Sequence, residues 1–147
     1  MINISIDCDP KFISPNHDIV KQTASLVFKK NQILDGNVSF IFGSDNLVSE
    51  LKKQFFQKDQ WTDVIAFRLN EYDEKDVEGE IYISLPRAKE NAVSYQEVFE
   101  KEVVRLIIHG SLHLLGFNDE SDNEKKVMTK MENNFINQIS WQTLFEI

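Results

Sequence analysis

Four short segments of the chain have the pattern of hydrophobic and polar positions that predicts β-strands. Residues 2–6 alternate between apolar and polar side chains, as in a strand that buries one face. Residues 38–42, 63–67 and 79–84 also have the pattern of strands. The acidic stretch 71–78 has few apolar residues, so we expect a solvated loop at the tip of an antiparallel hairpin formed by the last two strands.

Helical spacing of apolar residues predicts about five helices. The first begins at Asn16, whose side chain is suited to capping, and runs to about Lys30. Shorter helices begin at residues 43–44 and at Pro86, and the last begins at Ser121 within a capping-box sequence. We expect two of these helices to bury apolar stripes, formed by Leu47, Val48, Leu51 and Phe55 in the second helix and by Val127, Met131 and Phe135 in the last.

The longest helical pattern covers residues 95–115 and is apolar on most sides near its end, so it predicts a central buried helix. Gly116 ends it, because glycine readily adopts the positive φ of a helix C-terminus. Together the segments predict an α+β fold, with a four-stranded mixed sheet packed against about five helices. No repeat or linker divides the chain, so we expect residues 1–147 to form a single domain.

Composition and charge narrow the class of protein. Hydrophobic residues make up 41% of the chain, which is typical of a globular protein, and no apolar run approaches the ~20 residues that cross a bilayer. The N-terminus lacks the pattern of a secretory signal, and the single Cys8 cannot form an internal disulfide. We therefore expect a cytoplasmic protein. The net charge of −8 argues against a non-specific nucleic-acid coat protein, but a local basic patch would still allow a nucleic-acid substrate.

The segment 109–119 carries the residues best suited to chemistry. His109 and His113 are four residues apart on the predicted helix, so both imidazoles lie on one face and can reach one metal ion. Gly116 lets the chain fold back and bring a third ligand to the same ion. Asp119 is placed for this role, and Asn118, Glu120 and Asp122 nearby are the alternatives. Burying two unpaired imidazoles would be costly, which favours metal binding over simple packing.

Three protein ligands leave a fourth position for water, which is the arrangement of catalytic zinc sites. Histidine and carboxylate ligands favour Zn²⁺, although Ni²⁺, Co²⁺ and Mn²⁺ bind overlapping sites. Zinc peptidases of the HExxH type carry a glutamate general base directly after the first histidine. Here that position is Gly110, so a peptidase of that design is disfavoured.

The run from His109 to Asp119 resembles the HGxLHLxGYDH signature of the YbeY-type rRNA maturation factors, a family of metal-dependent, single-strand-specific endoribonucleases. Residues 58–67 are similar to the family's KDxPTDVLSF segment, and residues 79–84 to its GDIxIS strand. The resemblance implies an enzyme that cleaves ribosomal RNA, with a part in maturation of the 3′ end of the small-subunit rRNA and in ribosome quality control. It also implies the small ribosomal subunit as a partner.

The sequence departs from the family pattern at four positions. Asp119 stands where the family has its third histidine, and Asn118 where it has an aspartate. Phe56 stands where the family often has an arginine that is thought to contact RNA. Trp61 replaces the usual proline, and either packing or base stacking would account for it. An anionic Asp119 lowers the effective charge of the ion, so we expect water bound there to be somewhat less acidic.

Three basic residues are candidates for contacts with the substrate. Arg105 lies one helical turn before His109, where it is suited either to a substrate phosphate or to a structural salt bridge, for example with Glu102 or Glu80. Lys58 and Arg87 are candidates for RNA binding. We expect Arg105, His109 and His113 to form the catalytic site.

Two other functions stay open. One is a metal-dependent hydrolase of another substrate, such as a peptide. The other is a non-catalytic ribosome-assembly factor whose metal stabilises the fold, and this function predicts that His113→Ala unfolds the protein. The oligomeric state and the general base are not indicated by the sequence.

Overall fold

The computed structural model describes residues 1–57 and 62–145, and in it four strands form one mixed sheet in the order β1-β2-β4-β3. The strands are β1 (Ile2–Cys8), β2 (Gly36–Gly43), β3 (Val64–Arg68) and β4 (Val77–Ser84). β1 and β2 are parallel, as are β2 and β4, whereas β3 is antiparallel to β4. The predicted α+β class, the mixed sheet and the hairpin of the last two strands are confirmed.

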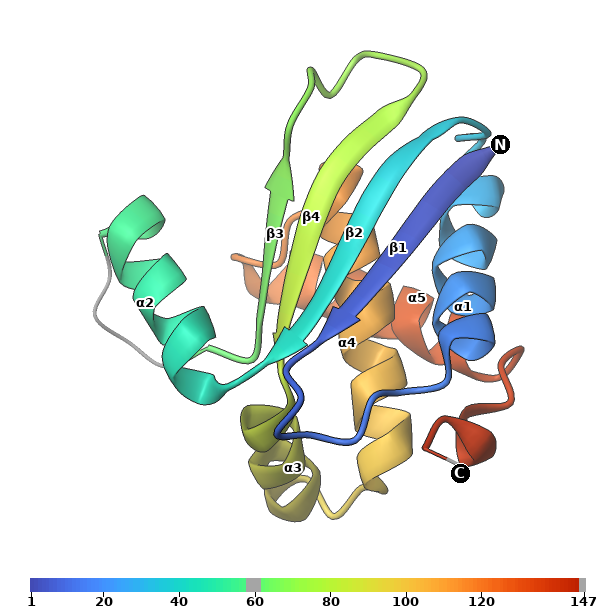
Figure 1. The fold of residues 1–147 in the computed structure, drawn as a ribbon. Helices are drawn as coiled ribbons and strands as arrows, with labels where there is room; N and C mark the ends of the chain where they lie inside the picture. The colour runs from blue at the N-terminus through green and yellow to red at the C-terminus, as the bar shows by residue number, and fades with distance from the viewer. Residues whose placement is uncertain (58–61, 146–147) are drawn as a thin grey trace.

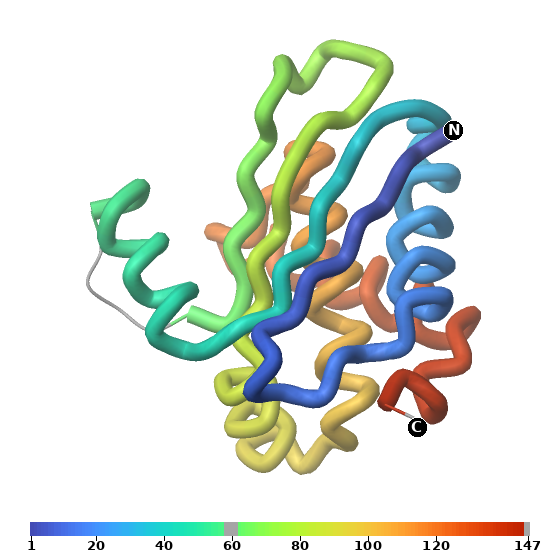
Figure 2. Tube along the Cα trace, in the orientation of Figure 1, coloured from blue at the N-terminus to red at the C-terminus, as the bar shows by residue number. Residues whose placement is uncertain are grey.

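Five helices accompany the sheet in the described part of the chain: α1 (His17–Lys30), α2 (Asp45–Phe56), α3 (Leu85–Ser94), α4 (Phe99–Leu114) and α5 (Asp122–Ile136). A short 3₁₀ turn, η1 (Trp141–Thr143), follows them. In Figure 1, α1, α4 and α5 form a layer behind one face of the sheet, and α2 stands beyond the β3 edge. The tube in Figure 2 shows α4 behind the sheet, with α1 beside it at the β1 edge.

The core lies between α4 and the covered face of the sheet. Inward residues of β2 and β4, such as Phe40 and Ile81, are fully buried and join Ile107 and Leu112 of α4 in one apolar cluster. The approach is close at Gly110, where an added Cβ would lie 2.7 Å from Cγ2 of Ile81. Only glycine lets α4 pack this tightly against β4, so the sheet directly supports the last two turns of the helix.

Several predicted helix ends are confirmed. Asn16 caps α1, and Ser121 and Glu124 form the predicted capping box at the start of α5. Gly116 has a φ of +95° and lies directly after Leu115, the C-cap residue of α4.

The predicted start of the central helix at residue 95 is wrong. α3 extends to Ser94, and Gln96 adopts a positive φ of 55°, which breaks the helical path before α4 begins at Phe99. Tyr95 and Val98 continue the apolar pattern but are exposed. The helical spacing of apolar residues therefore continues through a turn, whose apolar side chains are exposed.

The predicted inward stripes of α2 and α5 are only partly correct. Val48 is buried in α2, but Leu47 is 38% and Phe55 58% exposed, because α2 stands beside the edge strand and not across a face of the sheet. In α5, Phe135 is buried as expected, whereas Val127 is 50% exposed. The buried positions of α5 are Met128, Glu132, Phe135 and Ile136.

Within the described residues, no helix is both long and apolar enough to span a membrane.

Candidate metal centre

The last turns of α4 bring the two histidines together. His109 and His113 lie one turn apart, with their Nε2 atoms 2.9 Å from each other and their rings edge to face. After Gly116 turns the chain back, Asp119 places Oδ2 at 3.2 Å from Nε2 of His109 and Oδ1 at 3.5 Å from Nε2 of His113. The helix and the turn therefore converge two nitrogen atoms and a carboxylate on one point.

One candidate ligand atom from each of these three residues lies within 4.8 Å of the others. All three residues are partly exposed, so the cluster faces solvent on one side. Two imidazole nitrogens and one carboxylate oxygen form a donor set that suits Zn²⁺, which binds such atoms at roughly 2.0–2.2 Å. The residues present thus fit a single divalent ion with an open coordination position.

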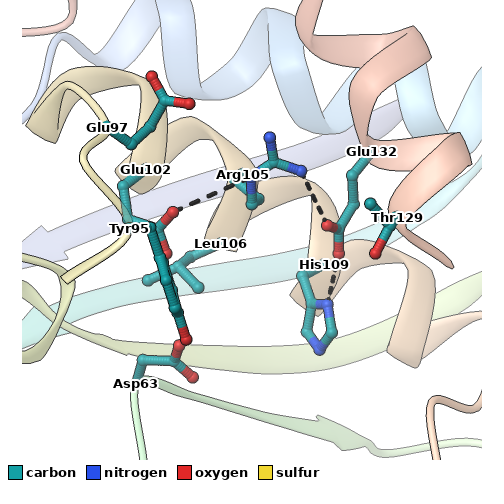
Figure 3. A pocket seen from close by; sticks show the side chains of 9 residues that line it. All are labelled: Asp63, Tyr95, Glu97, Glu102, Arg105, Leu106, His109, Thr129 and Glu132. Atoms are coloured by element: carbon teal, nitrogen blue, oxygen red, sulfur yellow. Dashed lines mark hydrogen bonds and ion pairs between the residues drawn. The ribbon is translucent and has the colours of Figure 1, made fainter. Parts of the chain in front are cut away.

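A buried carboxylate from α5 contacts the opposite side of the His109 ring. Oε2 of Glu132 lies 2.6 Å from Nδ1 of His109, and Nη1 of Arg105 donates to Oε1 of Glu132 at 3.1 Å. Figure 3 shows Glu132 between the arginine and the histidine. The two imidazole nitrogens of His109 therefore have different partners, with Nε2 in the cluster and Nδ1 on Glu132.

A cavity of about 470 Å³ adjoins this side of His109. Acidic residues from three parts of the chain line it, together with Arg105 and the ring of Tyr95 (Figure 3). These acids are Asp63, Glu97, Glu102 and Glu132. Their proximity makes the cavity electronegative, which favours cations over phosphate groups inside it.

Burial and neighbouring charges shift several pKa values around the cavity. Burial is the main cause that raises the pKa of Asp63, and burial with the nearby charge of Asp63 raises the pKa of Glu102 to about 7, against the opposing effect of Arg105. Burial by itself would lower the pKa of His109, but the hydrogen bond and charge of Glu132 raise it on balance. Burial and the charge of His109 lower the pKa of His113.

Comparisons with known proteins show the family to which the chain belongs. The family model described as Endoribonuclease YbeY matches residues 7–140. The chain belongs to the YbeY endoribonuclease family. It is 42% identical over 124 residues to an Endoribonuclease YbeY of Amoebophilus asiaticus, covering 84% of each chain. It is 34% identical over 132 residues to that of Flavobacterium psychrophilum, covering 90% of this chain and 91% of the relative.

A solved structure is similar throughout. The solution structure of a Thermotoga maritima protein matches with a TM-score of 0.63 and 32% identity, covering 92% of this chain and 87% of that one. The described fold is therefore shared with a relative whose structure was determined independently.

The position at which the YbeY pattern often has an arginine lies at the end of α2. Phe56 stands there, and its ring stacks on Phe67 of β3 at 5.9 Å between centroids, while Nζ of Lys52 lies 4.9 Å from the Phe56 ring centroid. An aromatic and cationic surface thus takes the place of a guanidinium at this edge of the sheet.

The other residues expected to act on the substrate have varied surroundings. Arg105 makes a salt bridge with Glu132 and a longer one with Glu102, in which Nε of Arg105 lies 3.9 Å from Oε1 of Glu102. These contacts match the structural salt bridge that was one of the two roles expected for Arg105. Arg87 at the start of α3 forms ion pairs with Asp45 and Glu90. Lys58 and Trp61 lie outside the described residues.

Sequence reasoning did not single out Asp63 or Glu132, and it named Glu102 only as a possible salt-bridge partner of Arg105. Asp63 and Glu132 come from segments far from the motif, and Glu102 lies seven residues before His109. The sequence shows only that Glu132 is an acidic residue next to the apolar stripe of α5. This position does not indicate that its side chain reaches His109. Asp63 lies in the segment similar to the family's KDxPTDVLSF run, but its partner Asn91, which donates to Oδ2 at 2.8 Å, is on α3.

Proposed function

We propose that the protein is a zinc-dependent endoribonuclease that cleaves single-stranded RNA and acts in rRNA processing. The observation that carries the proposal is the solvent-facing cluster of His109, His113 and Asp119 in a member of the YbeY family. In this role the substrate is precursor rRNA, the product is the mature 3′ end of the small-subunit rRNA, and the partner is the small ribosomal subunit. Processing and ribosome quality control would take place in the cytoplasm.

The three ligands would hold the ion through Nε2 of His109, Nε2 of His113 and a carboxylate oxygen of Asp119. A bound zinc ion supplies Lewis acidity for phosphodiester hydrolysis. The cluster's partial exposure leaves room for a phosphodiester of an extended strand to approach. Asp119 adds a negative charge that a third histidine would not, and so weakens the ion's electrostatic effect.

Peptide hydrolysis is less well supported by the packing of α4. A peptidase of the HExxH type needs a glutamate at the position of Gly110. An added Cβ there would lie 2.7 Å from Ile81 and 3.2 Å from Val64, so this side of the helix has no space for a general base.

Contacts with the RNA backbone are proposed for Lys58 and Arg87. Arg87 has one guanidinium nitrogen 2.6 Å from Asp45, and an RNA phosphate would have to compete with that carboxylate. Arg105 is proposed to support catalysis, and its contacts with Glu132 suggest how.

Cleavage of an RNA hairpin with a single-stranded 3′ tail tests the proposal. We expect the zinc-loaded protein to cut only in the tail, and we expect His113→Ala or a chelator to abolish the cuts. His17→Ala is the matched control, because His17 is an exposed histidine at the start of α1 and should leave cleavage unchanged. The same samples are tested for hydrolysis of a peptide library.

Hydrolysis of peptides without cleavage of RNA would overturn the proposal in favour of another hydrolase. If His113→Ala unfolds the protein and the folded wild type cuts nothing, the metal is structural and the assembly-factor function replaces the enzyme.

A further inference from the structure

Glu132 is a buried carboxylate that lies outside the set of candidate ligands. It is only 5% exposed, although it stands on a helix whose other polar residues mostly face solvent. Ionised carboxylates are seldom buried without compensating partners, because removing their charge from water is costly. Both oxygens of Glu132 have such partners, His109 on one side and Arg105 on the other.

The contact with His109 selects one tautomer of the imidazole. Nδ1 of His109 lies 2.6 Å from Oε2 of Glu132, and because a carboxylate oxygen accepts hydrogen bonds, this contact favours the tautomer with the proton on Nδ1. In a neutral ring the lone pair is then on Nε2, which is the atom that faces His113 and Asp119. Glu132 therefore turns the correct nitrogen toward the ion and holds the ring plane against rotation.

Arg105 in turn holds Glu132. Its Nη1 donates to Oε1 of Glu132 at 3.1 Å, and its Nη2 donates to Oδ1 of Asn133 at 2.9 Å. The guanidinium is thus clamped onto two successive residues of α5. Because Arg105 and His109 are one turn apart on α4, the same two helices carry every member of this chain of contacts.

We propose that Glu132 is the positioning residue of the metal centre, and that Arg105 acts through Glu132 by holding its carboxylate in place beside His109. The inference rests on the metal site of the proposed function. It does not depend on RNA as the substrate, so it is tested by metal binding alone.

The first experiment measures the Kd of Zn²⁺ by competition with a chromophoric chelator. We expect Glu132→Ala to weaken zinc binding by about 10–100-fold, which is the usual loss when the partner of a ligating histidine is removed. Glu132→Gln keeps one acceptor oxygen for Nδ1 but places an amide group near Arg105, so we expect a smaller loss. Arg105→Ala should also weaken binding, by less than Glu132→Ala.

Met128→Ala is the matched control on α5. Met128 is 2% exposed and packs in the core, so its truncation destabilises the same helix without removing a hydrogen-bond partner of His109. We expect this variant to unfold more easily and yet to bind zinc within about threefold of wild type, since its metal ligands keep their partners.

The second experiment records ¹⁵N NMR spectra of histidine-labelled, zinc-loaded protein. We expect the wild type to show His109 with a protonated Nδ1 and a metal-bound Nε2. We expect Glu132→Ala to lose this signature in part of the molecules, because no acceptor then holds the proton on Nδ1. The wild-type spectrum decides the matter even if a variant fails to fold, because a metal-bound Nδ1 contradicts the proposal directly.

Zinc affinity within threefold of wild type in folded Glu132→Ala would also overturn the inference. If Arg105→Ala loses RNA cleavage but keeps both zinc affinity and the His109 signature, Arg105 contacts the substrate and does not act through Glu132. Failure of the proposed function appears separately, as tight zinc binding in a wild type that cuts no RNA.

Discussion

Helices α4 and α2 differ in how completely the rest of the fold surrounds them. Ten described residues of α4 are buried, whereas in α2 only Val48 is. α4 carries His109 and His113, and α2 ends at Phe56, where the family pattern changes. Ligands that must converge within fractions of an ångström stand on the helix that packing holds rigid. The exposed helix tolerates changes in the residues that would contact a substrate.

The largest expected contrast is in the cost of truncating an apolar residue on each helix. Ile107→Ala should lower the free energy of unfolding by about 2–5 kcal/mol, because Ile107 is fully buried and its loss leaves a cavity. Phe55→Ala on α2 should cost less than about 1 kcal/mol, since Phe55 is mostly exposed. Urea unfolding of the metal-free variants measures both. Equal losses would show that α2 is packed as tightly as α4.

The buried acid on α4 should make stability depend on pH. Glu102 is 3% exposed and its folded pKa is raised to about 7, so the unfolded chain loses the proton first and stability falls as the pH rises from about 4.5 to 7. Glu102→Gln should remove this loss and stabilise the protein by about 2–3 kcal/mol at pH 8, with little effect at pH 4.

Urea unfolding at pH 4, 6 and 8 measures this pH dependence. Glu50→Gln, at an exposed position of α2, is the control and should change stability by less than about 0.5 kcal/mol at each pH. If Glu102→Gln raised the free energy of unfolding by the same amount at all three pH values, the raised pKa of Glu102 would not be the cause of the gain.

The close approach of α4 to the sheet should resist even one added methyl group. Gly110→Ala should destabilise the protein by about 1–3 kcal/mol, because the branched side chain of Ile81 cannot move aside cheaply, although alanine favours a helix. The displaced helix should also bind zinc more weakly. Thermal unfolding and zinc competition measure the two effects.

Gln54→Ala on the exposed side of α2 is the control for this change and should leave both quantities unaltered. A stabilised Gly110→Ala variant with normal zinc affinity would mean that α4 has more freedom against the sheet than the structure indicates.

The smallest expected effect concerns the end of α2. Phe56→Arg adds a cation at the position where the family often has arginine, and we expect it to raise the kcat/KM for a single-stranded RNA by a few-fold through phosphate contacts. Phe56→Leu, which removes the ring without adding charge, should give no increase. Zinc affinity should be the same in both variants, since neither touches α4. A loss of cleavage in Phe56→Arg would instead assign substrate contact to the aromatic surface.

The cluster of His109, His113 and Asp119 was predictable because it is local. His109 and His113 are neighbours on any α-helix, and Gly116 adopts the positive φ needed to return the chain toward Asp119. The capping box at Ser121 was predictable for the same reason, since both of its hydrogen bonds join residues three positions apart. Strand periodicity and the hairpin likewise follow from short-range patterns.

Interruptions and orientations were less predictable. Gln96 adopts a positive φ although it is not a glycine, so the sequence did not indicate a turn there. The apolar spacing alone therefore predicted a helix that continued across the turn. The face that α2 buries depends on its place at the β3 edge, which periodicity does not give.

By itself the sequence determined the fold class, the three side chains that converge at the end of α4 and the membership of the YbeY endoribonuclease family. Only the tertiary structure decided which residues hold those side chains in place. Glu132 reaches His109 because α5 packs beside α4, and Arg105 faces Glu132 because both lie on the contacting sides of those helices. Such contacts depend on the angle and register at which two separate helices meet, and these are set by the packing of the whole core.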